Sequence, residues 1–316
     1  MFKKYLLLIS IILALISLGA CRSNTEEPST ASKEEKQLTD STNTEIILDK
    51  GPTEIVCLTE ICVDTLHLLE IEPSGVSAGG ITQEPEFFGE WADTIPIIGG
   101  TFFEPNIEDI YQLNPELVIG LGGVHDSLRE SLGDIPLYIV SPSSYKDSIE
   151  FVREMGELTG KQELAETAIK NFENQIQLFK EQTSKDITTL VMYGSDMNFG
   201  IDTKESVVGS LLAEGVNYPW STDENSESHS SGGTQFSLEE VLKQNPDIIF
   251  VETFSFDENI PSLSDQLSKS PIWGELKAVQ NDQVHEVRTN IWANGRGLGS
   301  LSIVLDEATE IIESSK

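Results

Sequence analysis

Short apolar runs alternate with amphipathic stretches along most of the chain. Residues 54–58 (EIVCL) predict a strand, and residues 61–71 (ICVDTLHLLEI) predict the helix that follows it. The same alternation continues to residue 160 and begins again near residue 186. Strands that alternate with helices favour a mostly parallel sheet with helices on both faces. The pattern therefore predicts an α/β protein.

One uninterrupted helical pattern separates the two alternating regions. In residues 161–185 apolar side chains recur at spacings of three and four, and neither Pro nor Gly interrupts them. A helix of that length spans about 36 Å at 1.5 Å per residue. We therefore expect two Rossmann-like lobes with mostly parallel sheets, residues 46–160 and 186–316, joined by one long rigid α-helix. A ligand cleft is expected between the lobes.

The N-terminal residues 1–20 have the pattern of a secretory leader. Two lysines precede an apolar run that is shorter than the about 20 residues a membrane-spanning helix needs. The sequence Leu-Gly-Ala-Cys that ends at Cys21 resembles the lipobox of bacterial lipoproteins, which implies cleavage before Cys21 and a lipid on its thiol. An uncleaved anchor is the alternative. Residues 22–44 contain one Leu and no aromatic residue, so residues 21–45 are expected to form a flexible lipidated tether.

Charge and cysteine content narrow the class of protein. The formal net charge of −33 repels nucleic acid and anionic membrane surfaces, so we expect no nucleic-acid partner. Cys57 and Cys62 do not have the spacing of a CxxC redox or zinc motif, and we expect two small buried residues. A disulfide between them stays open at this point.

A helix–turn–strand unit occurs twice. Residues 106–120 (NIEDIYQLNPELVIG) and 237–251 (SLEEVLKQNPDIIFV) each have a capping residue, an acidic first turn, an apolar helical face, an Asn-Pro stop and a strand. Each copy places a glutamate in the first helical turn, Glu108 and Glu239. Stabilisation by the helix dipole is a sufficient reason for an acid there.

The repeated unit, the glycine-ended strands and the long helix resemble the class III substrate-binding proteins of ABC importers, which serve iron-siderophore, haem and cobalamin uptake. The resemblance covers roughly residues 46 to 314, and it includes GGTQFSLEEVLKQNPDIIFVE and PIWGELKAVQNDQVHEV. It implies an extracellular receptor, anchored by lipid to the cell membrane, that acts as a monomer with an ABC permease. It also implies that Glu108 and Glu239 dock onto arginines of that permease, and that the protein has no catalytic residues and no cofactor of its own.

Ligands of open α/β sheets bind beyond the carboxyl ends of the strands. The aromatic side chains and cations expected at such positions are Phe103, Tyr193, Lys204, Trp292 and Arg296. Aromatic rings offer flat apolar area, and arginine pairs with carboxylate or iron-bound oxygen.

Histidine enters only through one alternative cargo. His125, with Met197 opposite, would ligate the iron of haem if haem were carried. No pair of histidines has metal-ligand spacing, so a bare metal site is not expected.

Few basic residues lie near the predicted cleft: Lys204, Arg288 and Arg296. A ferric siderophore of the hydroxamate type, which carries little negative charge, is therefore the favoured cargo, with haem or cobalamin as alternatives. An extracellular hydrolase is a further alternative, although the sequence contains no G-x-S-x-G, H-E-x-x-H or P-loop motif. A surface adhesin is the last alternative, and it predicts no saturable binding of a small molecule.

Overall fold

The computed structural model describes residues 35–77, 80–222, 233–254 and 261–315. The expected leader, the lipidated Cys21 and most of the expected tether lie outside these residues. No helix in the described ranges is both long enough and apolar enough to cross a bilayer.

The N-terminal half is built on a five-stranded sheet in which every neighbouring pair is parallel. Its strand order is β5-β4-β3-β6-β7. The strands are β3 (Ile55–Cys57), β4 (Gly75–Ser77), β5 (Ile97–Ile98), β6 (Leu117–Leu121) and β7 (Leu137–Val140). The helices are α2 (Glu60–Leu68), η1 (Gly89–Thr94), α3 (Ile107–Leu113), α4 (Leu128–Leu132) and α5 (Tyr145–Thr159).

The C-terminal half contains a second five-stranded sheet, with the order β10-β9-β8-β11-β12. Its strands are β8 (Thr189–Gly194), β9 (Gly200–Asp202), β10 (Gly233–Gln235), β11 (Ile248–Thr253) and β12 (Val284–Glu286). Strand β9 runs antiparallel to both of its neighbours, while β8, β11 and β12 are parallel. The helices are α7 (Val207–Leu212), α8 (Leu238–Gln244), α9 (Leu263–Leu267), η2 (Trp273–Glu275), α10 (Lys277–Gln280), η3 (Asn290–Gly295) and α11 (Leu298–Ser314).

The two sheets share one strand order when each is numbered from its own first strand. In both, the third, second, first, fourth and fifth strands lie side by side in that order. The repeated unit of the sequence supplies the fourth strand each time, as α3–β6 and as α8–β11. Asn114 and Asn245 end the two helices in the left-handed conformation, with φ of 46° and 47°, and a proline follows each. The repetition is therefore one of fold position as well as of sequence.

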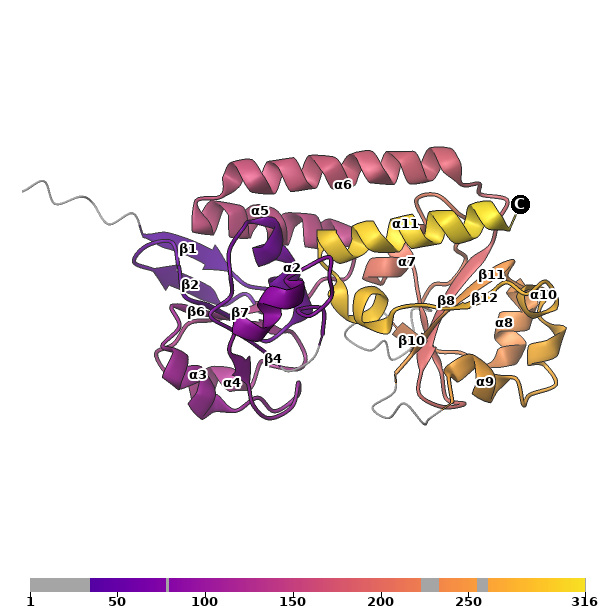
Figure 1. The fold of residues 1–316 in the computed structure, drawn as a ribbon. Helices are drawn as coiled ribbons and strands as arrows, with labels where there is room; N and C mark the ends of the chain where they lie inside the picture. The colour runs from indigo at the N-terminus through magenta and orange to yellow at the C-terminus, as the bar shows by residue number, and fades with distance from the viewer. Residues whose placement is uncertain (1–34, 78–79, 223–232, 255–260, 316) are drawn as a thin grey trace, which may run out of the picture. The chain divides into compact units, whose positions relative to one another are not determined.

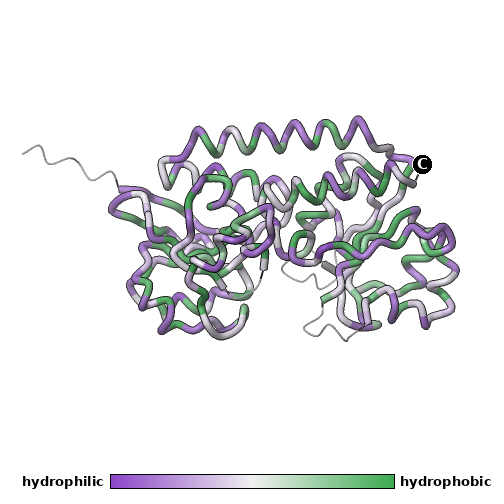
Figure 2. The backbone as a smooth tube through the Cα atoms, viewed as in Figure 1, coloured by the Kyte–Doolittle hydropathy of each residue, from purple (hydrophilic) through white to green (hydrophobic). Residues whose placement is uncertain are grey.

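The long helix predicted between the halves is α6 (Gln162–Gln182). It lies along α5 and α11, as Figure 1 shows. Its buried face consists of Ala165, Ile169, Phe172, Ile176 and Phe179, and hydrophilic and hydrophobic positions alternate along it in Figure 2. The predicted fold class, two mostly parallel α/β lobes with one long connecting helix, is confirmed.

Two features differ from the expectations. The described residues begin with a hairpin of β1 (Lys36–Thr39) and β2 (Glu45–Leu48), where the tether was expected to continue to residue 45. Strand β10 lies at the end of residues 221–235, whose polar, Gly-rich sequence suggests a surface loop. The sequence does not predict this strand, because its three residues carry no apolar periodicity and depend on pairing with β9.

The structure also answers a question about the cysteines that the sequence leaves open. Cys57 and Cys62 are fully buried, as expected, and they form a disulfide with a Cα–Cα distance of 5.5 Å. The bond ties the carboxyl end of β3 to the first turn of α2.

Candidate functional site

The site lies where the first and fourth strands of each sheet adjoin. In a sheet of this order the connections diverge to opposite sides at that point, which leaves a crevice at the carboxyl ends of the strands. The residues at these ends are Leu121 and Gly122 at the end of β6, Tyr193 near the end of β8, and Glu252 and Phe254 on either side of the last residue of β11. All of them line one of two adjoining hollows.

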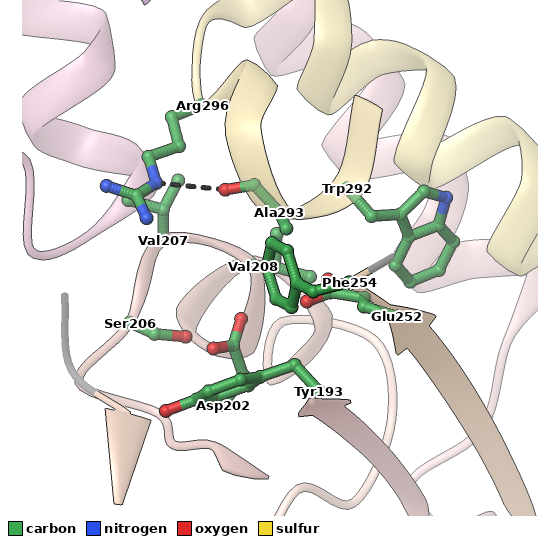
Figure 3. Close-up of a pocket in the computed structure, with 10 residues that line it drawn as sticks. All are labelled: Tyr193, Asp202, Ser206, Val207, Val208, Glu252, Phe254, Trp292, Ala293 and Arg296. Carbon is green, nitrogen blue, oxygen red and sulfur yellow. Dashed lines mark hydrogen bonds between the residues drawn. The ribbon is translucent and has the colours of Figure 1, made fainter. Parts of the chain in front are cut away.

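The first hollow lies in the C-terminal half and measures about 80 Å³. Figure 3 shows the side chains that surround it. They are Tyr193, Asp202, Ser206, Val207, Val208, Glu252, Phe254, Trp292, Ala293 and Arg296. Its wall therefore combines aromatic rings with two carboxylates and one guanidinium.

The second hollow, of about 160 Å³, is lined mainly by the N-terminal half. Its walls are Phe102, Leu121, Gly122, Val124, Ser141 and Pro142, together with Arg296. Arg296 thus belongs to both hollows and marks the place where the two halves meet. Pockets for drug-sized ligands usually measure about 300–1,000 Å³, so neither hollow alone is large enough for a bulky ligand.

Backbone contacts hold Arg296 at this junction. The residue has a left-handed conformation, with φ of 56°, directly after the π-helical turn η3. Its Nε–H donates to the carbonyl of Ala293 at 3.1 Å, and its own carbonyl accepts a hydrogen bond of 2.7 Å from the Ser148 hydroxyl on α5. A Cβ at Gly297 would lie 2.3 Å from the carboxyl carbon of Asp64, so only glycine fits beside Arg296 there.

The carboxylates of the first hollow are strongly affected by burial. Desolvation raises the pKa of Asp202 to about 6, although the charge of Arg296 and a hydrogen bond from Ser206 act in the opposite direction. Burial also raises the pKa of Glu252 well above its usual range, and the nearby Asp202 adds to this. Glu252 is 1% exposed, and its Oε1 has no hydrogen-bond partner. Desolvation raises the pKa of Tyr193 to about 12.

Three of the predicted cleft residues come together here. Arg296, Tyr193 and Trp292 line the first hollow, where Tyr193 packs edge-on against Phe254 with ring centroids 6.2 Å apart. Trp292 is buried, and its indole N–H donates to Glu307 at 2.7 Å. This hydrogen bond fixes the ring that forms one wall.

Phe103 and Lys204 do not belong to either hollow. The Phe103 side chain is 67% exposed, and Phe102 occupies the wall in its place. The loop folds back where Gly100 pairs with Pro105, and this turns the second phenylalanine outward. The side chain of Lys204 is exposed as well. Their contact with a ligand stays a prediction.

His125 has a structural role in place of the expected contact with ligand. It is completely buried, its Nδ1 accepts the backbone N–H of Leu121 at 2.9 Å, and its Nε2–H donates to the carbonyl of Phe102 at 2.7 Å. Both ring nitrogens are therefore occupied, and neither is open to haem iron. The imidazole instead fixes Phe102 in the wall. Met197, the expected opposite ligand, lines a separate hollow together with Glu239.

Arg288 is neutralised by acidic side chains. It lies 2.9 Å from Glu86, 3.6 Å from Glu84 and 2.7 Å from Glu307. Two of these acids belong to the N-terminal half, so the cluster joins the halves beside the cleft. Of the three basic residues expected near the cleft, Arg296 alone lines the two hollows.

Glu108 and Glu239 are both exposed in the first turns of α3 and α8. The Asn106 side chain caps α3 by accepting the N–H of Glu108, and a capping box of Ser237 and Glu240 begins α8. The caps are made by neighbouring residues, which leaves both glutamates accessible to a partner.

The sequence reasoning missed the two acids of the first hollow. Glu252 lies at the carboxyl end of the apolar run 248–251, where ligands of open α/β sheets bind. An acid at the carboxyl end of an apolar run was the available signal. Asp202 had no comparable signal, because the short strand β9 was not predicted. In the described ranges, no group of three or more His, Cys, Asp or Glu side chains is arranged to hold a metal ion.

The two α/β halves have the same strand order, and a polar hollow lies at their junction. This architecture defines a binding protein of the two-lobe class. The chain belongs to the periplasmic binding protein family, whose pattern matches residues 55–290. This family comprises the substrate-binding components of ABC importers, as the sequence resemblance indicated, and it is not a family of enzymes.

Individual relatives and one solved structure agree with this assignment. The iron-uptake system-binding protein of Bacillus subtilis is 29% identical over 302 residues, which cover 90% of each chain. YhfQ of the same organism, whose name gives it provisionally as an ABC transporter substrate-binding lipoprotein, is 25% identical over 328 residues and 99% of each chain. The crystal structure of the petrobactin-binding protein YclQ from Bacillus subtilis superimposes with a TM-score of 0.74, at 20% identity over 89% of this chain and 99% of that one. The structural likeness shows a shared fold.

Proposed function

We propose that this protein captures a ferric siderophore outside the cytoplasm and delivers it to the permease of an ABC importer. The observation that carries the proposal is the pair of hollows that meet at Arg296, at the strand ends where this architecture binds ligands. Relatives of the chain are named for iron–siderophore and iron–citrate binding, which supports iron complexes as the class of cargo.

The charges around the hollows favour a complex with little negative charge. Arg296 shares its hollow with Asp202 and Glu252, and Arg288 is already paired with acids. A triply anionic tricatecholate complex would be repelled by the two carboxyl groups, because the site has no excess positive charge to offset them. A ferric hydroxamate complex avoids that repulsion. Haem is less well supported, because both ring nitrogens of His125 are engaged.

Binding is tested by titrating the protein with iron complexes while its tryptophan fluorescence is recorded. Trp292 lines the first hollow, so a ferric complex bound there should quench its emission in a saturable way. The panel contains a ferric trihydroxamate, a ferric tricatecholate, ferric citrate, haem and cobalamin. We expect the trihydroxamate to bind most tightly. Saturation by haem or cobalamin alone would favour those cargoes, and no saturation by any compound would refute the receptor function.

Membrane attachment and docking complete the proposal. The thiol of Cys21 would carry the lipid anchor, and Glu108 and Glu239 would each pair with an arginine of the permease. Exposed ion pairs contribute only about 0–1 kcal/mol each, which suits a contact that forms and separates in every transport cycle.

Docking is tested by the uptake of radioactive ferric siderophore into cells that express variants. We expect Glu108→Gln combined with Glu239→Gln to lower uptake and to leave the Kd for cargo unchanged. Glu130→Gln is the matched control, because Glu130 is an exposed acid in the first turn of α4 that belongs to neither repeat. Equal uptake by the double variant and the control would contradict the docking role.

A further inference from the structure

The proposed function leaves the two acids of the first hollow unexplained. Glu252 is 1% exposed and its Oε1 has no hydrogen-bond partner, although it lines the hollow. A buried carboxyl group without a hydrogen-bond partner lowers the stability of the folded protein. Such a group is expected where a bound ligand supplies the missing partner. Figure 3 shows the carboxylates of Asp202 and Glu252 around the space bounded by Tyr193 and Phe254.

Arg296 does not satisfy these acids. Its Nε–H is directed to the Ala293 carbonyl, and within the described ranges no ion pair of 4.0 Å or less joins it to Asp202 or Glu252. Arg296 also faces the second hollow, where it is the charged residue of the lining. The guanidinium is thus placed to meet the body of a ligand, and the two acids remain available on the opposite side.

We infer that Asp202 and Glu252 form a cation-accepting subsite, which selects iron complexes that carry a pendant protonated amine. This inference rests on the proposed function and names the class of cargo that fits it. The first hollow holds about 80 Å³, and a water molecule takes about 30 Å³ of liquid volume. A terminal aminomethyl group therefore fits there, whereas a whole ferric complex does not. The aromatic walls of Tyr193 and Phe254 suit an ammonium group as well.

Binding of a cation in this subsite should be linked to proton release. Asp202 on β9, Tyr193 on β8, Tyr218 and Arg296 are the titratable groups that act on Glu252 or share its surroundings. Burial keeps the pKa of Glu252 high in the empty protein, so the group holds a proton that an incoming ammonium must displace. Affinity for an amine-bearing complex should then rise as the pH rises through about 6, the pKa to which burial raises Asp202, and affinity for a neutral complex should stay level.

The test compares three ferric complexes by isothermal titration calorimetry. The first is a linear ferric trihydroxamate with one free primary ammonium, the second is the same complex N-acetylated and therefore neutral, and the third is a triply anionic ferric tricatecholate. We expect the cationic complex to bind at least about tenfold more tightly than its acetylated form, and the tricatecholate to bind most weakly, as a charge-assisted hydrogen bond in a buried site implies.

Variants identify the groups responsible for that preference. Glu252→Gln and Asp202→Asn keep the size of the side chains, and each should reduce the tenfold preference to less than about threefold with little change for the acetylated complex. Glu310→Gln removes one exposed charge on α11 and should leave the preference intact.

The possible outcomes separate the two proposals. Equal binding of the cationic and acetylated complexes, tightest binding of the tricatecholate, or a preference that survives both variants would overturn the subsite and leave the receptor function standing. Failure of every ferric complex to bind would instead remove the receptor function, and the subsite with it.

Discussion

Replacement of Asp64 should destabilise the junction between the two halves. Asp64 on α2 is completely buried, and it accepts the N–H of Gly299 at 2.8 Å, the N–H of Ser300 at 2.7 Å and the Ser300 hydroxyl at 2.6 Å. These two N–H groups belong to the first turn of α11, whose N-cap residue is Gly297 and has no side chain to cap them. Asp64 therefore acts as a cap supplied from the opposite half of the protein.

The size of the effect follows from the groups left behind. Asp64→Ala leaves two buried N–H groups and a hydroxyl without an acceptor, and each unsatisfied group is worth about 1–3 kcal/mol. Rotation of the Ser300 hydroxyl and entry of water would recover part of this loss. We expect the free energy of unfolding to fall by about 3–5 kcal/mol, close to the effect of breaking a buried ion pair. Asp64→Asn keeps one oxygen acceptor and should lose about half as much.

Urea denaturation followed by circular dichroism measures both variants, with the free energy extrapolated to zero urea. Cargo affinity provides a second readout, because α11 follows directly after Arg296 and its displacement would move that side chain. A loss smaller than about 1 kcal/mol for Asp64→Ala, with unchanged cargo affinity, would show that the cap does not hold the halves together.

The same residue gives a pH dependence of definite sign. Burial raises the pKa of Asp64 to about 6, because desolvation outweighs the hydrogen bonds from Ser300 and Gly299. The folded protein then binds this proton more tightly than the unfolded chain, in which an aspartate has its ordinary pKa of 3.8. The contribution of Asp64 to stability is therefore complete below about pH 4 and declines as the pH rises towards about 6. Asp64→Asn should lack this decline.

Three further predictions concern single side chains. Arg296→Gly should raise the Kd for cargo more than about tenfold. The Tm should not fall, because glycine readily adopts the φ of 56° at this position. A lower Tm would contradict this prediction. The ion pair with Lys50 and the N–H groups it accepts lower the pKa of Glu116 to about 2, so its contribution is present above about pH 4.5 and is lost as the pH falls. Glu116→Gln should flatten that acid limb in thermal unfolding, and an unchanged limb would count against the reasoning. In urea titrations Asn245→Gly should lower the free energy of unfolding by about 1 kcal/mol, because the Asn245 side chain accepts the N–H of Lys277 at 2.8 Å. Asn114→Gly should leave the free energy of unfolding unchanged. Equal losses in the two variants would contradict this prediction.

The helices and strands that could be predicted from sequence are those with a clear local pattern of apolar residues. Strands β6 and β11 are apolar runs that follow an Asn-Pro stop, and α6 has a regular apolar face. The hairpin of β1 and β2, by contrast, alternates exposed and buried positions over only four residues per strand, and it depends on pairing. Such short strands carry too little periodicity to be distinguished from a polar tether.

The site was predictable where chemistry coincided with backbone signals. Arg296 lies between glycines, and Tyr193 and Trp292 lie at the ends of predicted elements, so each could be assigned to the cleft. Phe102 lines the second hollow and Phe103 does not, because a tight turn decides which of two adjacent side chains points inward. The burial of His125 could not be predicted, because its hydrogen bonds arise from a fold-back of the chain after β6, which no local pattern indicates.

We propose that an iron complex binds where the two halves meet at Arg296. Diffraction data collected at the iron absorption edge from crystals grown with a ferric trihydroxamate would locate the metal directly by its anomalous signal. We expect a single strong peak beside Arg296, between the carboxyl ends of β6 and β11. A peak elsewhere on the protein, or a complex that occupies the crystal without touching either hollow, would contradict it.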